Sequence, residues 1–258
     1  MAGKKKVLAK VIEQKKLSEG IYDLWLETEI AKDAVCGQFV GVYPKDKSHI
    51  LPRPISICEV NKNKNQLRLV YRVQGEGTKE FSTLKEGDAI QILGILGNGF
   101  PIFEGKGKRV ILMGGGIGVP PILQLAKEIE AESSVVLGYR NQELFLKEEF
   151  ETYGKVYVAT EDGSVGTKGN VMDAVRENNL SADVIYACGP LPMLKAIKEF
   201  AEKEGIPAYI SLEERMACGV GACLGCVCKT TKIDHHSHVN NARICTEGPV
   251  FLAEDIMI

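Results

Sequence analysis

The chain has 258 residues, a hydrophobic fraction of 45%, a charged fraction of 26% and a formal net charge of −2. This length predicts roughly two domains, and the near-neutral charge gives no indication of a nucleic-acid partner. The lysines at positions 4–6 precede no long apolar run, and the uncharged stretch 110–126 is rich in glycine and proline. Neither a signal peptide nor a membrane helix is therefore expected. We expect a cytoplasmic protein whose cysteines stay reduced.

Residues 7–100 have the pattern of short strands separated by turn signals. The β-rich segments are residues 7–12, 21–28, 39–43, 55–60, 66–72 and 89–93. Six strands at this spacing, with no helical period between them, predict a small antiparallel β-barrel.

One segment of this region, residues 53–56, has the sequence Arg-Pro-Ile-Ser. Pro54 removes a backbone donor and stiffens the strand, while Arg53 offers a planar fork for a phosphate. Ser56 adds a hydroxyl or amide donor. So short a motif also occurs without any function. We nevertheless predict a cofactor contact at each of its residues, Arg53, Pro54, Ile55 and Ser56.

A second segment follows at residues 70–78, where a strand runs into a Gly-x-Gly-Thr turn. An aromatic ring on the strand can stack on a cofactor, and bare amides in the turn can hold a pyrophosphate. The alternative for the glycines is an ordinary hairpin loop. The predicted cofactor residues here are Val70, Tyr71, Arg72, Gly77 and Thr78.

Residues 94–101 are rich in glycine and give the best domain boundary. Beyond them, strands alternate with helical segments, which is typical of a parallel α/β sheet. A strand at 109–113 leads into glycines 114–118, and a helix is expected over 122–132. Proline at position 121 replaces the third glycine of the Gly-x-Gly-x-x-Gly pattern, and no acidic residue ends the next strand. The segment is therefore not the ordinary dinucleotide fingerprint.

The predicted sheet continues with strands at 156–160 and 184–187 and helices at 170–178 and 193–204. In an open α/β sheet, ligands bind beyond the carboxyl ends of the strands. Cys188 ends one strand and is a candidate catalytic residue, with a buried structural thiol as the alternative. The other residues predicted at this edge to bind a nucleotide are Gly115, Gly116, Gly118, Tyr139, Arg140, Asp162, Gly189 and Pro190.

Near the end of the chain, cysteines occur with the spacing C-x4-C-x2-C, followed by a distant cysteine. This is the spacing of plant-type [2Fe–2S] ligation. The interleaved glycines 219, 221 and 225 remove side chains that would collide with a cluster, and they allow positive φ. The predicted iron ligands are Cys218, Cys223, Cys226 and Cys245.

Other interpretations of these cysteines remain open. A zinc site could combine Cys223 and Cys226 with the histidines at 235, 236 and 238, but Cys218 and the glycines would then have no role. A disulfide framework is not needed in a chain of this length. Cys228 lies two residues after Cys226, where a strand-like step would turn it away, so we predict that it is not a ligand.

An iron–sulfur cluster transfers single electrons, so a flavin, a nicotinamide or both are expected elsewhere in the chain. The stretch around the first three of these cysteines also carries apolar side chains, which favour a docking surface. The alternative is that they only shield the cluster from water. The set is Met216, Ala217, Val220, Ala222 and Leu224.

Taken together, these motifs resemble the ferredoxin–NADP reductase superfamily. Residues 214–226 and the Cys-Thr-Glu-Gly-Pro-Val-Phe sequence at 245–251 resemble, more narrowly, the electron-transfer subunits of NAD-dependent dihydroorotate dehydrogenase B. The resemblance spans nearly the whole chain. It implies an FAD-binding barrel domain (1–101), an NAD-binding α/β domain (102–210) and a [2Fe–2S] domain (211–258). It also implies docking on an FMN-containing catalytic subunit, in a heterotetramer with two copies of each.

The relay implied by the resemblance begins with dihydroorotate oxidation on the partner's FMN. Electrons then pass through the cluster and FAD to NAD⁺, with Cys188 near the nicotinamide. Many superfamily members carry an aromatic residue where this chain has Ile55, so Tyr71 is the candidate for stacking on the flavin. Arg140 suits the 2′-phosphate of NADP, but no basic cluster accompanies it, and NAD is expected.

Two other functions are compatible with the same motifs. One is a small flavin and iron–sulfur subunit of another NAD(P)H-linked complex, such as a transhydrogenase, sulfide dehydrogenase or hydrogenase. The other is a colourless zinc-stabilised adaptor whose glycine loops are purely structural.

Overall fold

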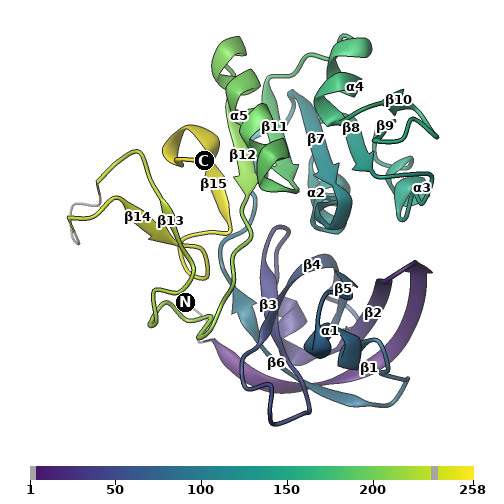
Figure 1. The fold of residues 1–258 in the computed structure, drawn as a ribbon, viewed down its shortest axis with the longest axis vertical. Helices are drawn as coiled ribbons and strands as arrows, with labels where there is room; N and C mark the ends of the chain where they lie inside the picture. Colours follow the sequence, from purple (N-terminus) through teal and green to yellow (C-terminus); the bar gives the residue numbers. More distant parts are fainter. Residues whose placement is uncertain (1–3, 234–237) are drawn as a thin grey trace. The chain divides into compact units, whose positions relative to one another are not determined.

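The computed structural model describes residues 4–233 and 238–258, and these form two compact units (Figure 1). The first unit comprises the residues up to Gly99 together with Glu213–Val227 and Arg243–Pro249. The second comprises Phe100–Leu212, the described part of Cys228–Ala242, and Val250–Ile258. The C-terminal segment therefore contributes to both units.

The first unit is built on a closed antiparallel barrel, as the sequence predicts. Its strands follow one another around the barrel in the order β1-β2-β5-β4-β3-β6. They are β1 (Lys5–Ser18), β2 (Ile21–Glu27), β3 (Phe39–Tyr43), β4 (Arg53–Asn61), β5 (Gln66–Arg72) and β6 (Ala89–Leu96).

Alternate residues of the strands fill the barrel, as the period of two requires. Leu67, Leu69 and Tyr71 of β5 all belong to its core. The ring of Tyr71 stacks on Tyr22 at 5.9 Å between centroids and meets Phe81 edge-on at 6.1 Å. Each such ring contributes roughly 1.5–3 kcal/mol through burial, so the barrel has a well-packed interior.

One helix interrupts this region where the sequence indicates only a turn. Helix α1 (Glu76–Phe81) begins immediately after Gly75. The Thr78 hydroxyl accepts hydrogen bonds from the backbone N–H groups of Gln74 (2.9 Å) and Gly75 (3.2 Å). The expectation of a Gly-x-Gly-Thr turn is therefore wrong, because Thr78 closes the first turn of a helix.

The second unit contains a sheet of strand order β10-β9-β8-β7-β11-β12-β15. All neighbouring pairs are parallel except β12 with β15, which is antiparallel. The parallel α/β prediction is thus confirmed. The strands are β7 (Arg109–Gly115), β8 (Glu132–Tyr139), β9 (Lys155–Thr160), β10 (Thr167–Lys168), β11 (Val184–Cys188), β12 (Ala208–Ser211) and β15 (Val250–Leu252).

The helices of this unit connect its strands. Packing brings α2 against β7 and β11, α4 against β8 to β10, and α5 against β11 and β12. Helix α2 ends at Glu128 rather than at the expected residue 132, because Ile129 already has extended backbone. The helices are α2 (Pro120–Glu128), α3 (Lys147–Phe150), α4 (Val171–Glu177) and α5 (Leu191–Glu204).

Smaller elements complete the chain. Strands β13 (Val227–Lys229) and β14 (Asn241–Arg243) pair as a two-stranded sheet. Single 3₁₀ turns are η1 (Glu29–Asp33), η2 (Ile102–Glu104), η3 (Gly116–Gly118) and η4 (Ala253–Asp255). Within residues 4–233 and 238–258, no helix is both long enough and apolar enough to span a bilayer.

Candidate cofactor-binding sites

The four predicted cluster ligands lie in the first unit as two pairs of thiols. The backbone N–H of Cys223 donates to Cys218 Sγ at 3.4 Å, and the two side chains also interact. The thiols of Cys226 and Cys245 form the second hydrogen-bonded pair. Cys226 and Cys245 are buried, whereas Cys223 is exposed.

Glycine conformations and one backbone contact bring these pairs together. Gly219 and Gly221 have φ values of +67° and +84°, a region that residues with a side chain rarely adopt. The backbone N–H of Ile244 donates to the carbonyl of Cys226 at 2.9 Å, which brings the returning segment alongside the loop. Cys245 follows Ile244 directly and so lies beside Cys226.

Backbone amides face the sulfur atoms of the loop. N–H groups of Val220 and Cys223 donate to Cys218 Sγ, each at 3.4 Å, and that of Gly225 donates to Cys223 Sγ at 3.4 Å. The Val220 amide is the main cause that lowers the pKa of Cys218 to about 6. Burial, followed by the neighbouring Cys226 thiol, raises the pKa of Cys245 to about 11. Amide donors favour thiolate, the form that binds iron.

The donor set fits a [2Fe–2S] cluster better than a single metal ion. In the described parts of the chain, no three His, Cys, Asp or Glu side chains converge on one metal position. A structural zinc ion needs four ligands around one point, whereas a [2Fe–2S] cluster takes two thiolates on each of two irons. Two separate pairs match that requirement. His238 is exposed, and His235 and His236 lie outside the described residues.

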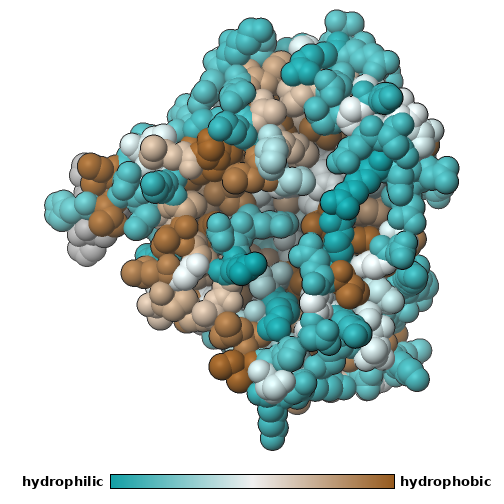
Figure 2. All heavy atoms as spheres, in the orientation of Figure 1, coloured by the Kyte–Doolittle hydropathy of each residue, from teal (hydrophilic) through white to brown (hydrophobic). Residues whose placement is uncertain are grey.

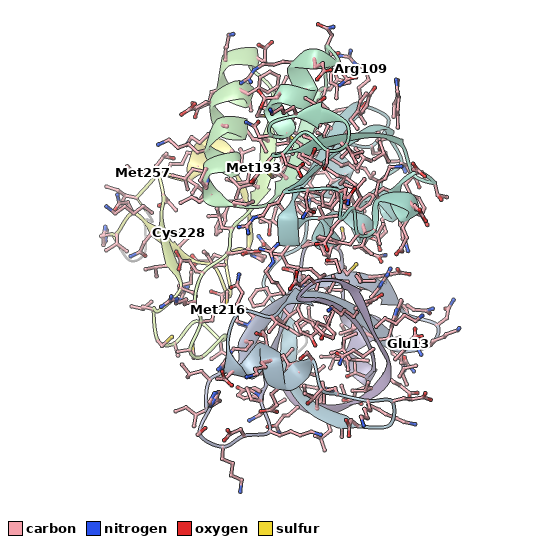
Figure 3. All side chains as sticks on the ribbon, turned by 45° about the vertical axis from the view of Figure 1, so that its right-hand side comes forward. Glu13, Arg109, Met193, Met216, Cys228 and Met257 are labelled. Carbon is pink, nitrogen blue, oxygen red and sulfur yellow. The ribbon has the colours of Figure 1, made fainter. Side chains whose placement is uncertain are left out.

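Cys228 lies on strand β13 (Figure 3). Its thiol donates to the carbonyl of Ala242, with 3.6 Å between sulfur and oxygen. The contact closes the β13–β14 hairpin and is in keeping with the predicted role as a non-ligand.

The cluster segment, defined as Glu213–Val227 and Arg243–Pro249, packs on the barrel within the first unit. Asn98 donates through its backbone N–H to the Gly248 carbonyl (2.6 Å) and through its side chain to the Glu247 carbonyl (2.9 Å). Gly219 lies against the side chains of Leu93 and Leu96 of β6. The segment is therefore fixed to the barrel and does not hang free.

The two predicted phosphate-binding segments of the barrel meet at one point. A Cβ atom built on Gly77 would lie 2.7 Å from Nε of Arg53. The Arg53 guanidinium thus covers the first turn of α1, where N–H groups lack partners within the helix. It also donates to the Leu51 carbonyl. Guanidinium and free amides side by side are suited to an anionic group.

Other predicted flavin contacts are placed differently. Tyr71 is 2% exposed, and its hydroxyl donates to Gln14 at 2.9 Å. It therefore belongs to the barrel core, and its assignment as the ring that stacks on a flavin is wrong. Ile55 also packs against the core. Arg53, Pro54 and Ser56 are half-buried, as is Arg72, whereas Val70 is buried outside the barrel core.

The carboxyl edge of the α/β sheet brings its glycines close to the end of β11. A Cβ atom on Gly118 would lie 2.3 Å from the carbonyl oxygen of Cys188. Cys188 is fully buried, and its carbonyl faces the glycine-rich turn. Gly116 has a φ of +54° and starts η3, which leads into α2.

The remaining edge residues differ in exposure. Arg140 and Asp162 are exposed, and Asp162 accepts a hydrogen bond from the Ser164 backbone at 2.9 Å. Tyr139 is buried, and its hydroxyl donates to the Phe145 carbonyl at 2.9 Å. The Tyr139 side chain therefore packs inside the unit and does not lie on the exposed edge.

Sequence reasoning missed Met193, which lies in the first turn of α5 (Figure 3). A Cβ atom on Gly115 would lie 2.4 Å from its Sδ, and one on Gly189 would lie 2.5 Å from its Cε. Met193 thus covers two glycines of the predicted nucleotide edge, next to Pro190. The sequence offered one signal for Met193: it lies three residues after Pro190, on the helix that follows the strand.

Two family models match parts of this chain. Residues 213–257 match the model of the iron–sulfur cluster binding domain of dihydroorotate dehydrogenase B, and residues 112–199 match the oxidoreductase NAD-binding domain. The chain is similar to a chain of the NADH-dependent reduced ferredoxin–NADP oxidoreductase, with a TM-score of 0.86 and 30% identity, covering 100% of this chain and 91% of the other. A ferredoxin–NADP⁺ reductase from Neisseria gonorrhoeae (TM-score 0.65, 16% identity, 81% and 94% covered) shares the fold.

Two relatives carry the name dihydroorotate dehydrogenase B (NAD(+)), electron transfer subunit. That of Lysinibacillus sphaericus is 44% identical over 249 residues, covering 94% of this chain and 95% of the relative. That of Caldanaerobacter subterraneus is 43% identical over 253 residues, covering 98% of each. The chain therefore belongs to the family of electron transfer subunits of NAD⁺-dependent dihydroorotate dehydrogenase B.

Proposed function

We propose that this chain carries electrons from a dihydroorotate-oxidising partner subunit to NAD⁺, as an oxidoreductase subunit in pyrimidine biosynthesis. The observation that carries the proposal is the assembly of four thiols into two pairs in a segment that packs on the barrel. The chain is proposed to act in the cytoplasm, where its thiols stay reduced.

Cys218, Cys223, Cys226 and Cys245 would hold the cluster. Bound there, a [2Fe–2S] cluster supplies one-electron transfer. The amides of Val220, Cys223 and Gly225 lie against the ligand sulfurs, so they stabilise the negative charge of the thiolates. Burial of Cys226 and Cys245 keeps water from one side of the ligand set.

Arg53, Ser56, Gly77 and Thr78 would hold FAD, which supplies the change between two-electron and one-electron transfer. Arg53 neutralises a phosphate, and the absence of a side chain at Gly77 lets the ligand approach the backbone. Thr78 contributes through its backbone, since its hydroxyl already accepts from Gln74 and Gly75.

The role of Arg53 can be tested through flavin content. Loss of a charge-assisted phosphate contact costs about 1.5–3 kcal/mol, or roughly 10- to 150-fold in affinity. Arg53→Ala should therefore purify with little flavin and full iron. Arg176→Ala, which removes an exposed arginine of α4, is the matched control. Equal flavin content in both variants would contradict the assignment.

The glycine-rich edge of the sheet would hold NAD. Gly115, Gly116, Gly118 and Gly189 leave room for a backbone approach, and the exposed Arg140 and Asp162 lie on neighbouring loops at the same edge. With its thiol buried, Cys188 shapes the turn through its carbonyl. The chain's own part would be to hold the nucleotide against this backbone edge.

The cluster segment would also be the docking surface for an FMN-containing catalytic subunit, in a heterotetramer of two copies each. Leu224 is 59% exposed and Val220 43% exposed. Figure 2 shows apolar side chains where Figure 1 draws the cysteine-bearing loop. Exposed apolar surface of this kind is usually covered by a partner.

Leu224→Glu tests this surface. A buried charge at an interface should weaken association by about 2 kcal/mol or more, roughly 30-fold, while flavin and iron stay in place. Leu8→Glu, at a 71% exposed leucine of β1, is the matched control. Normal co-elution of the Leu224→Glu chain with its partner would place the docking surface elsewhere.

The decisive experiment combines the chain with its catalytic partner and dihydroorotate. The complex should reduce NAD⁺, whereas the isolated chain should oxidise NADH with an artificial acceptor and show no dihydroorotate turnover. A colourless chain without iron or flavin would refute the proposal.

A second candidate function is the small flavin and iron–sulfur subunit of another NAD(P)H-linked complex. The likeness to the NADH-dependent ferredoxin–NADP oxidoreductase chain, at 30% identity over the whole chain, favours it. It predicts the same cofactors and a different partner. Co-purification of an iron–sulfur partner with no dihydroorotate activity would decide for this candidate.

A further inference from the structure

The cluster segment contains a buried hydroxyl without a hydrogen-bond partner. Thr246 Oγ1 has no solvent contact and no partner among the described residues. Almost all buried polar atoms of folded proteins are paired, so an orphan of this kind calls for a physical explanation. Thr246 directly follows the proposed ligand Cys245.

The position of this hydroxyl is fixed by its own backbone and by Gly221. The Thr246 N–H donates to the Arg243 carbonyl at 3.1 Å. A Cβ atom on Gly221 would lie 2.9 Å from Cγ2 of Thr246 and 3.4 Å from its Oγ1. The Gly221 amide in turn donates to the Cys245 thiol. The hydroxyl and the thiol therefore lie against the same residue of the ligand loop.

The other orphan atoms are located in a different part of the barrel unit. They are Thr28 Oγ1 and Asn65 Oδ1, and the backbones of these two residues are hydrogen-bonded to each other at 2.7 Å. Neither residue is near a proposed ligand in the sequence. Thr246 alone of the three adjoins the cysteines.

We propose that Thr246 donates a hydrogen bond to a sulfur atom of the bound [2Fe–2S] cluster and thereby raises its reduction potential. The inference rests on the proposed cluster. Sulfurs of the cluster accept hydrogen bonds, and such bonds are one of the means by which proteins set cluster potentials. Reduction adds negative charge, so a donor stabilises the reduced form more than the oxidised form.

Thr246→Val tests the proposal, because it keeps the shape of the side chain and removes the hydroxyl. Thr246→Ser is the control that keeps the donor. The midpoint potential of the cluster is measured in the cofactor-loaded complex by monitoring the signal of the reduced cluster with electron paramagnetic resonance. The Thr246→Val variant should have a midpoint potential about 59 mV lower than the native protein. For a one-electron couple, this shift raises the ratio of oxidised to reduced cluster at a fixed potential about tenfold. Ser should remain close to the native value.

Equal potentials in native protein and Thr246→Val, at equal iron content, would overturn the proposal and assign the hydroxyl to a buried water. If Thr246→Val does not load iron, Thr246→Ala removes the donor without adding apolar bulk. Loss of iron in Thr246→Val and Thr246→Ala, with full iron in Thr246→Ser, would support the hydrogen bond. Loss of iron in Thr246→Ser as well would overturn it. A native chain that binds no cluster would instead refute the proposed function.

Discussion

Two glycine-rich segments of this protein use glycine for different reasons. At the sheet edge, a side chain on Gly114 would lie 2.8 Å from Val119 Cα, and one on Gly118 would lie 2.3 Å from the Cys188 carbonyl. In the cluster segment, a Cβ on Gly225 would meet only Cys223 Sγ, at 3.4 Å. The first loop is closed by its own protein backbone, whereas the second leaves space beside its sulfurs.

Glycine density alone therefore does not identify a cofactor loop. Close backbone packing explains the sheet edge without any ligand, even where a nucleotide also binds there. The cluster segment lacks such packing at Gly225, and its amides face sulfur atoms. Gly225 therefore leaves space beside a proposed ligand, whereas Gly219 and Gly221 have positive φ and lie against other side chains.

The largest effect is expected from replacing a proposed ligand. Cys226→Ser should abolish cluster binding, because the second thiol pair loses one member. Cys228→Ser should retain full iron, since the Cys228 thiol donates to the Ala242 carbonyl, which a serine hydroxyl can also do. Iron per chain measures both. Full iron in Cys226→Ser together with loss in Cys228→Ser would reverse the assignment and remove the basis of the comparison.

A smaller effect separates the two glycine loops directly. Gly118→Ala should destabilise the fold by about 1–3 kcal/mol or more, because its methyl group clashes with backbone. That loss lowers Tm by roughly 2–12 °C for a chain of this size. Gly225→Ala should leave Tm of the cluster-free protein unchanged and reduce iron content. Equal losses of Tm in the two variants would show that both loops are closed by packing.

The smallest effect concerns charge near the cluster segment. Lys4 Nζ donates to the Gly219 carbonyl at 3.4 Å, whereas Lys5 pairs with Glu29 at 3.7 Å. Lys4→Gln should lower the cluster potential by roughly 30–59 mV, a three- to tenfold shift in its redox ratio. Lys5→Gln is the matched control. Because Lys4 is exposed, the difference should shrink at high salt; a difference unaffected by salt would contradict a charge effect.

Much of the fold followed from strand patterns and breakers. The six barrel strands and the parallel sheet were predicted because their apolar periods and glycine boundaries are local. Strand β15 was not predicted, since its pairing with β12 joins residues about 40 positions apart. Helix α1 was missed because two glycines within four residues indicate a turn more strongly than a helix.

The candidate sites show the same limit. The spacing of the cysteines predicted the four proposed ligands, whereas the meeting of Arg53 with Gly77 depends on tertiary structure. The error at Tyr71 was avoidable, because Leu67, Leu69 and Tyr71 alternate along β5 and must share its inward face. Thr246 and Lys4 carried no local signal, since only the folded segment brings them to the ligand loop.

The path of the chain has a consequence for biosynthesis. Cys218, Cys223 and Cys226 lie on one pass of the chain, and Cys245 arrives on a later pass that ends in β15. Synthesis proceeds from the N-terminus, so a nascent chain displays three thiols well before the fourth. Asn98 can hold Gly248 only after that last segment has emerged. With these four proposed ligands, a stable cluster would form only after residues 245–249 have been synthesised, and iron content would distinguish such chains from chains interrupted before them.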